Sequence, residues 1–176
     1  MQRRKFLLLM ATTPLIARSA FVGNALADTP KVQSLDDALR WLDRLGKIPS
    51  ARTSGAWPLV GVLDHLGQSI EMSMTGYPEL KSALFQSTAG AAAFAVFKWR
   101  GRMSHSLDEA IPGAPALVTQ GDWKISAQRL RTAINSYNAF KGELKPHFAY
   151  GVLSKSEFAL AHSFHIANHQ DEIVAG

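Results

Sequence analysis

Cysteine is absent from this chain of 176 residues, and its absence excludes several kinds of chemistry at once. There is no disulfide, no thiolate ligand for a metal, no cysteine nucleophile and no attachment point for a lipoprotein anchor. The chain is nevertheless long enough to bury a sizeable core in one domain. A content of 47% hydrophobic and 19% charged residues is typical of a globular protein and not of a disordered one.

Net charge is also low once the N-terminal segment is set aside. The formal net charge is +5, but residues 1–27 hold four basic residues and no acid, so the rest of the chain carries only +1. A domain with so little net charge has no electrostatic basis for attracting DNA or RNA. The sequence therefore predicts no nucleic-acid partner.

The N-terminal segment has the parts of a signal peptide. Arg3-Arg4-Lys5 is positively charged, and the apolar residues 6–17 are too few for the roughly 20 residues that cross a bilayer. Ala25-Leu26-Ala27 fits the cleavage site. The first residues resemble the twin-arginine motif, which implies export by the twin-arginine machinery; a general secretory signal is the alternative. We expect cleavage after Ala27 and a periplasmic mature domain, residues 28–176, without a membrane span.

Alternating strand patterns and internal repeats are missing, and apolar residues recur at helical spacing instead. The predicted helices lie near residues 34–46, 57–76, 79–103, 122–140 and 154–169. Gly90 and the alanines after it weaken the third segment, which is expected to form one helix or two pieces. Residues 50–56 and 104–118 are predicted loops. Four or five helices with apolar stripes indicate an all-α bundle.

Histidine is concentrated near the C-terminus, where three of the six lie within eight residues. His162, His165 and His169 share one helix face, because each residue turns a helix by about 100°. The spacing of His165 and His169 is the usual one for two helical imidazoles that bind one ion. A third ligand must come from another helix, and His65, beside the apolar stripe of the second segment, is the best candidate. Three neutral imidazoles with an open position suit zinc, nickel or iron.

Other interpretations of the histidines stay open. They could form a hydrogen-bonded network in the core or a pH-sensitive partner surface. His65 alone could be an ordinary half-buried side chain. His105 is expected in solvent, and His147 is expected to bond a backbone group. No acid lies between the last two histidines, so the metalloprotease pattern is absent.

Several motifs resemble the family called domain of unknown function 1569, within the DinB-like (YfiT-type) metal-binding superfamily. They occur in the right order and cover most of residues 34–172. The matching segments are residues 57–71, 73–78, 112–115, 146–151 and 161–169. The resemblance implies a four-helix bundle of the up-down-down-up type.

The resemblance also implies a ligand set. The superfamily places one metal-binding histidine on the second helix and an H-x-x-x-H pair on the last, which correspond to His65, His165 and His169. Its members usually continue with residues similar to His-Arg-Gly-Gln, whereas Gln-Asp-Glu follows here. This departure leaves His162 as an alternative ligand.

Two functional hypotheses follow from these observations. The first is a metal-dependent hydrolase or thiol transferase, because characterised relatives use their metal to activate a small thiol. The side chains that orient the metal ligands or transfer protons would come from His162, Gln68, Glu71, His147 and Tyr150. The second is a non-catalytic metal-binding, ligand-binding or structural module. Neither hypothesis identifies the small-molecule substrate, and a homodimer is compatible with the resemblance.

Overall fold

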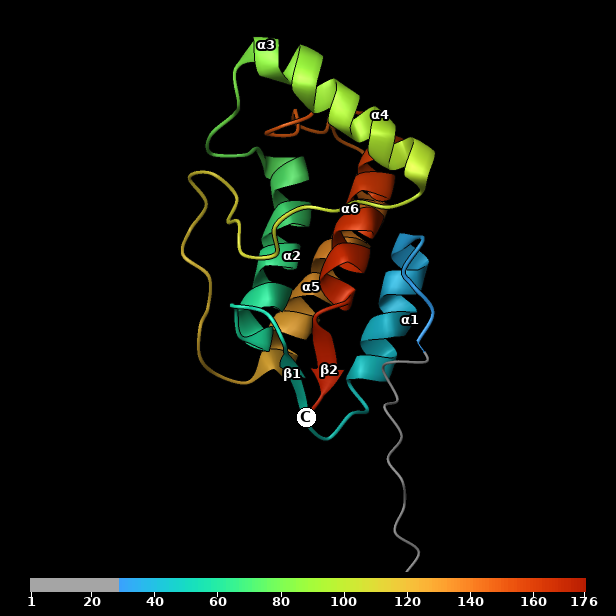
Figure 1. Cartoon of the computed structure of the whole chain (residues 1–176), viewed down its shortest axis with the longest axis vertical. Coiled ribbons are helices and arrows are strands. Elements are labelled where there is room, and N and C mark those ends of the chain that lie inside the picture. Colours follow the sequence, from blue (N-terminus) through green and yellow to red (C-terminus); the bar gives the residue numbers. More distant parts are fainter. Residues whose placement is uncertain (1–28) are drawn as a thin grey trace, which may run out of the picture.

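The computed structural model describes residues 29–176, so the predicted signal peptide lies outside the described residues. Four long helices pack as a bundle (Figure 1). They are α1 (Leu35–Leu45), α2 (Leu59–Thr75), α5 (Trp123–Ala139) and α6 (Lys155–Gln170). The prediction of an all-α fold is confirmed. Among residues 29–176, no helix combines the length and the apolar character needed to cross a membrane.

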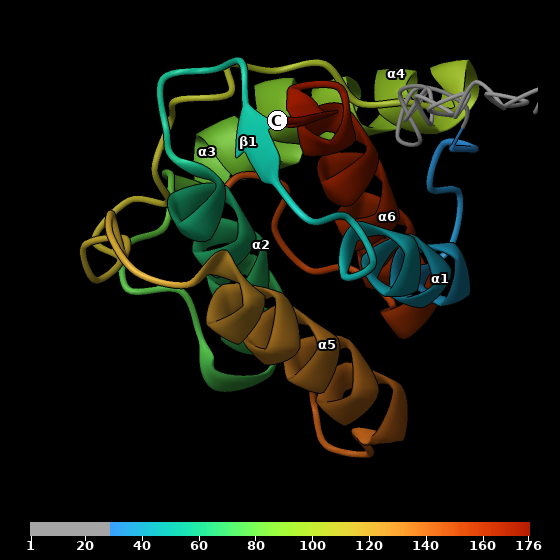
Figure 2. The ribbon, with the colours of Figure 1, turned by 90° about the horizontal axis from the view of Figure 1, so that it is seen from below.

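The four helices are arranged in a ring in which α2 packs on α5 and α6, and α1 closes the ring between α5 and α6 (Figure 2). The chain runs along the bundle in α1, returns in α2, takes the direction of α2 again in α5 and returns in α6 (Figure 1). This is the expected up-down-down-up order. It makes α2 and α6 neighbours that run in opposite directions, although about a hundred residues separate them.

Capping residues define the helix starts that the sequence predicts. The side chain of Ser34 accepts a hydrogen bond from the backbone N–H of Asp37 at the start of α1. At the start of α6, Ser154 and Glu157 form a reciprocal capping box. Gly76 ends α2 with a φ of 111°, a conformation that favours glycine. Local chemistry thus sets these ends of α1, α2 and α6, of which α2 and α6 carry histidines.

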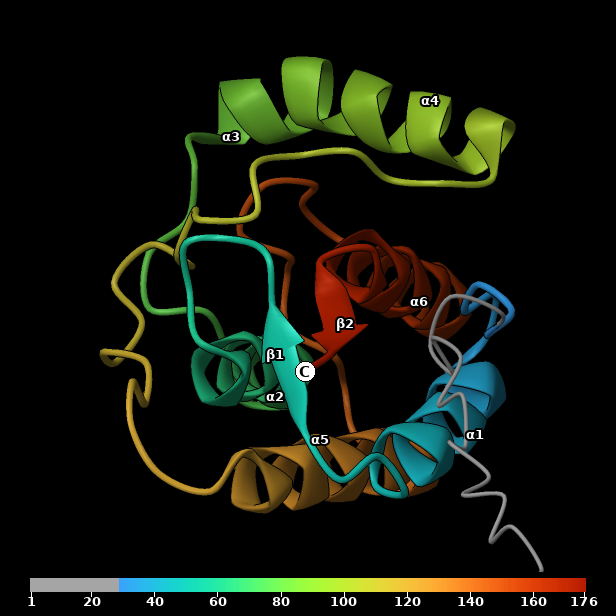
Figure 3. The ribbon, with the colours of Figure 1, turned by 60° about the horizontal axis from the view of Figure 1, so that its bottom comes forward.

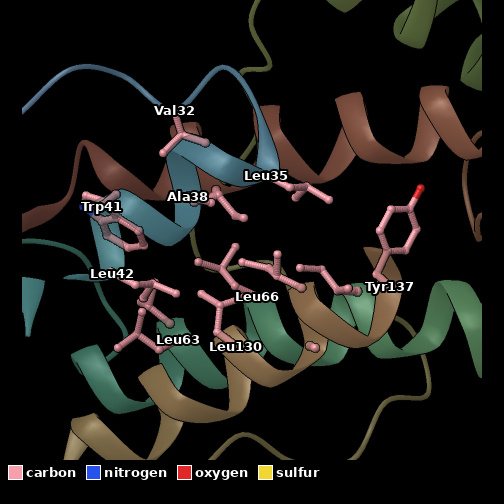
Figure 4. Packing of buried hydrophobic residues seen from close by; sticks show 14 of the residues in the cluster. Val32, Leu35, Ala38, Trp41, Leu42, Leu63, Leu66, Leu130 and Tyr137 are labelled. Atoms are coloured by element: carbon pink, nitrogen blue, oxygen red, sulfur yellow. The ribbon is translucent and has the colours of Figure 1, made fainter. Parts of the chain in front are cut away.

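One continuous core lies inside the ring, with side chains from α1, α2 and α5 meeting between the helices (Figure 4). The buried side chains labelled there are Val32, Leu35, Ala38, Trp41, Leu42, Leu63, Leu66, Leu130 and Tyr137. Burial of such apolar surface, at about 25 cal/mol per Å², is the main stabilising contribution to the fold.

Helix α2 is enclosed on all sides: 14 of its 17 residues are buried, including His65, Asp64, Gln68 and Ser69. Burial of polar side chains is unfavourable unless they find partners. Asp64 finds one in Arg129 of α5, at 2.5 Å, and Gln68 donates to the carbonyl of Pro115 at 3.2 Å. The polar surface of α2 is therefore organised around specific contacts.

A further helix covers one end of the bundle (Figure 3). It consists of α3 (Ala83–Phe85), a π-helical turn η1 (Gln86–Gly90) and α4 (Ala91–Arg100), which follow one another without a break. The prediction of a helix here is correct, in its single-piece form. Gly90 does not interrupt it but allows close packing, since a Cβ atom there would lie 2.0 Å from the carbonyl oxygen of Ala149.

A small antiparallel sheet is the main departure from the predicted elements. β1 (Ala51–Thr53) pairs with β2 (Ile173–Ala175), with Arg52 opposite Val174. The prediction of a loop over residues 50–56 without strands is wrong here. Three-residue strands are too short to show an alternating pattern, and their pairing depends on residues more than a hundred positions apart.

Candidate metal centre and adjoining cavity

The structure brings together the three histidines that the sequence analysis selected. His65 lies on α2, and His165 and His169 lie one turn apart on α6; one ring nitrogen from each falls within 4.8 Å of the others. The two Nε2 atoms of His65 and His165 are 3.1 Å apart. Two nitrogens bound to one tetrahedral ion at its usual distance are separated by about 3.3 Å. The spacing therefore fits a shared ion.

Burial keeps these imidazoles neutral. It lowers the pKa of His65 to about 4, with help from neighbouring His105, and that of His169 to about 3, with help from His65 and His105. Burial and the surrounding histidines hold the pKa of His165 well below its ordinary value. Neutral imidazole is the form that binds a metal, so the three side chains are in a form that could hold a cation at neutral pH.

Glu172 orients His169 and is a site residue that the sequence analysis missed. Nδ1–H of His169 donates to the Glu172 carboxylate at 2.6 Å, and both side chains are buried. The bond leaves the lone pair on Nε2 of His169, an atom without a hydrogen-bond partner among the described residues. A carboxylate behind a ligand histidine is the usual way to fix its tautomer and raise its basicity.

The small sheet holds Glu172 in place. The backbone carbonyl oxygen of Glu172 accepts a hydrogen bond from the backbone N–H of Ser54, just after β1, at 2.8 Å. Gly55 leaves room for the carboxylate, because a Cβ atom there would lie 1.9 Å from Oε2 of Glu172. Burial raises the pKa of Glu172. The sheet that sequence periodicity did not predict therefore supports the candidate site.

Two further rings lie beside the three histidines. Trp57, just before α2, meets His65 edge-on at 5.1 Å and stacks on His169 at 6.4 Å between ring centroids. His105, from the loop after α4, lies 5.1 Å from His165 and 5.9 Å from His169. The expectation that His105 lies in solvent is wrong, because it is half-buried against these rings.

His105 has a defined tautomer. Its Nδ1 lies 2.6 Å from the carbonyl oxygen of Ser106, so Nδ1–H donates, and in the neutral form of the ring the lone pair is on Nε2. The side chain of Asn168 donates to the His105 carbonyl at 3.3 Å and so ties this loop to α6. A signal for this residue existed in the sequence, since a loop this long is often packed over a site.

A cavity of about 280 Å³ adjoins the three histidines. His65, His165 and His105 line one end of it, whereas His169 does not line it. Ion and cavity would therefore meet at His65 and His165, with His169 and Glu172 behind. A cleft beside a candidate metal site is the arrangement expected where small molecules bind.

The remaining candidates from the sequence divide into two groups. Gln68 and Glu71 bind elsewhere: Gln68 donates to Pro115, and Glu71 forms an ion pair with Arg129. His147, Tyr150 and His162 line the cavity. The structure does not bring His162 into the group of three convergent nitrogens.

Comparison with known proteins shows the family to which the chain belongs. A family model described as protein of unknown function (DUF1569) matches residues 28–175. The chain belongs to the DUF1569 family. Searches of curated proteins and of solved structures found no match. The DUF1569 match spans both α2 and α6, and so all three convergent histidines lie within the family domain.

Proposed function

We propose that His65, His165 and His169 bind one divalent metal ion, and that the ion and the adjoining cavity form the site of a metal-dependent enzyme. The observation that carries this proposal is the convergence of three neutral imidazole nitrogens within 4.8 Å, with two of the three histidines, His65 and His165, lining the cavity. The resemblance to DinB-like proteins supports it, since that superfamily uses the same three positions.

The three imidazole nitrogens are suitable ligands for a divalent metal ion. Three nitrogen donors without a thiolate suit zinc, nickel or iron, and geometry alone does not choose among them. Glu172 supplies the carboxylate partner that ligand histidines usually have. Nε2 of His169 is buried without a hydrogen-bond partner in the described part of the chain, as expected of a ligand atom whose partner is an ion.

The reaction class we propose is hydrolysis or thiol transfer. A divalent ion with an open position acts as a Lewis acid and lowers the pKa of water or a thiol. His65 and His165 line the cavity, so an ion that they held would lie at the cavity wall, and Trp57 packs against His65 and His169. Nε2 of His105, with its lone pair kept by the bond to Ser106, is the group best placed to take a proton.

Metal content tests the proposal directly. Protein purified from its native compartment should hold about one divalent ion per chain, and the His169→Ala variant should lose the ion together with any metal-dependent rise in melting temperature. His147→Asn is the matched control: it removes a cavity histidine outside the convergent group and should keep the ion. Wild-type protein without stoichiometric metal, whose melting temperature zinc does not change, would refute the proposal.

A non-catalytic role is the second candidate. It is favoured by the complete burial of His169 and by the position of the site between α2 and α6, where an ion would join two helices. Cobalt substitution separates the two functions. Under the enzymatic proposal, the visible spectrum of the cobalt protein shifts when a small thiol is added; a purely structural site has a closed shell and gives no shift.

For the N-terminal segment we propose cleavage after Ala27 and export to the periplasm through the twin-arginine machinery. The arginine pair Arg3-Arg4 and the absence of acid in residues 1–27 support this route. Replacement of both arginines by lysine should leave the precursor in the cytoplasm. Unchanged export of that variant would indicate the general secretory route instead.

A further inference from the structure

A second polar surface lies in the same cavity, one helical turn away from the three convergent histidines. Ser69 follows His65 by four residues on α2, and His162 precedes His165 by three residues on α6; all four line the cavity. The turn that carries His147 completes this inner wall. The proposed metal ligands thus occupy one end of the cavity, and a different set of imidazoles occupies the other.

His162 has a fixed ring and an unused nitrogen. Its ring stacks on Phe158 at 5.6 Å and meets Tyr137 edge-on at 5.3 Å, and the side chain is only 2% exposed. Its Nε2 has no hydrogen-bond partner among residues 29–176. A buried polar atom without a partner is unfavourable, and phenylalanine would fill the same aromatic contacts without this cost. The position therefore points to a ligand that supplies the missing bond.

His147 faces the cavity with a defined donor. Its Nδ1 accepts hydrogen bonds from the backbone N–H groups of Ala149 and Tyr150, at 3.1 and 3.2 Å. The neutral ring therefore carries its proton on Nε2. Tyr150 stacks on the ring at 4.3 Å and holds it in this orientation. Burial, with His162 nearby, lowers the pKa of His147 to about 3, and burial lowers that of His162 to about 3 as well.

The rest of the wall restricts what fits. Met103, Ile111 and Ala161 are buried apolar lining residues, whereas the charged side chains in the lining, Lys81 and Glu109, belong to exposed residues. The inner end is thus uncharged, and a volume of about 280 Å³ is at the lower end of the range of small-molecule sites. A hydroxyl group suits two neutral imidazoles because it both donates and accepts a hydrogen bond.

We infer that the cavity binds a small, largely apolar molecule through an uncharged hydroxyl group held by His162 and His147. This inference rests on the proposed function in one respect: the opposite end of such a molecule would face His65 and His165. The hydroxyl subsite itself needs no metal, and so it is testable in metal-free protein.

The test compares three probes that share a benzene ring: benzyl alcohol, toluene and benzoate. Their dissociation constants are measured by NMR titration of metal-free and zinc-treated protein, together with the imidazole ¹⁵N shifts of His147 and His162. Two hydrogen bonds predict that benzyl alcohol binds about tenfold more tightly than toluene. In the metal-free protein, both imidazole shifts should change with the alcohol only, and benzoate should bind more weakly than the alcohol because its charge loses water without a cationic partner.

Variants make the test specific. His162→Phe keeps the stacked ring and His147→Asn keeps an acceptor for the turn; each should reduce the tenfold preference for the alcohol by at least threefold. Lys81→Ala is the matched lining control and should retain the full preference. Equal binding of alcohol and toluene, or preferred binding of benzoate that depends on Lys81, would overturn the inference.

The outcomes also separate this inference from the proposed function. If the protein preferred the alcohol but bound no zinc, the hydroxyl subsite would be supported and the proposal of a metal-dependent enzyme would be refuted. If the protein bound zinc but preferred the alcohol neither with nor without zinc, the metal centre would be supported and the hydroxyl subsite would be refuted. Because the ¹⁵N shifts are read in wild-type protein, the test does not depend on whether a variant folds.

Discussion

Replacement of Glu172 by glutamine tests whether the carboxylate behind His169 tunes the proposed metal centre. In the structure one carboxylate oxygen lies 2.6 Å from Nδ1 of His169, and the other, Oε2, is buried without a partner in the described residues. Glutamine keeps the size and the acceptor oxygen but removes the charge. The variant therefore isolates the electrostatic contribution of the carboxylate from its packing.

The expected effects have opposite signs with and without metal. Loss of such a carboxylate typically weakens metal binding by about 10- to 100-fold, or roughly 1.4 to 2.7 kcal/mol. For a domain of this size, that amounts to about 3 to 10 °C of the metal-induced rise in melting temperature. The metal-free variant should be no less stable than wild type, since a buried carboxyl group with an unpaired oxygen is itself unfavourable.

The assay combines calorimetric melting, with and without saturating zinc, and competition against a chelating dye. Asp171→Asn is the matched control, because Asp171 is the adjacent carboxylate and pairs with Lys31 at the surface. The control should change neither the metal-free melting temperature nor the affinity by more than twofold. Wild-type zinc affinity in Glu172→Gln would show that the carboxylate does not act on a metal ligand.

Three other predictions address the surrounding structure. His162→Phe should raise the free energy of unfolding by about 1 to 2 kcal/mol in urea titrations, since it removes a buried unpartnered nitrogen and keeps the ring contacts; a loss of stability would indicate a bond to that nitrogen. Gly90→Ala should lower the free energy of unfolding by about 1 to 3 kcal/mol, and with it the urea midpoint, because the new Cβ atom would press on the backbone oxygen of Ala149; an unchanged midpoint would show that the two segments separate easily. Bonds to Lys98 and to the start of α6 lower the pKa of Glu157 to about 2, so its contribution to stability is present above about pH 4.5 and is lost as pH falls towards 2. Glu157→Gln should make the free energy of unfolding less dependent on pH in this range. Identical pH profiles of stability for the variant and the wild type would contradict the assignment of this effect to Glu157.

Much of the fold follows from local signals in the sequence. Ser34, Ser154 and Gly76 mark helix ends through capping and backbone conformation, and each acts within a few residues of its position. The pair His165 and His169 was predictable for the same reason, because helical spacing places both on one face. His65 required the additional assumption that α2 packs beside α6, which the bundle confirms.

The parts that sequence reasoning missed depend on contacts between distant segments. The turn after α6 brings the carboxylate of Glu172 to His169, three residues away, and the pairing of β2 with the distant β1 holds that turn in place. His105 lies in a loop without periodicity, and only packing against α6 brings it to the histidines. His162 shares a face with His165 in sequence terms, yet its ring lies between Phe158 and Tyr137. Periodicity shows which side chains share a helix face, but it does not show which of them reach the candidate metal site.

The position of the proposed ion has a consequence for the unfolded chain. His65 and His165 are 100 residues apart in sequence, and an ion that binds both would close a loop of that length. In the chain-entropy description, a permanent cross-link of this span removes enough freedom from the unfolded state to contribute about 4.7 kcal/mol. A protein without cysteine would thereby obtain, from coordination bonds that exchange with solvent metal, the kind of constraint that many exported proteins obtain from a disulfide.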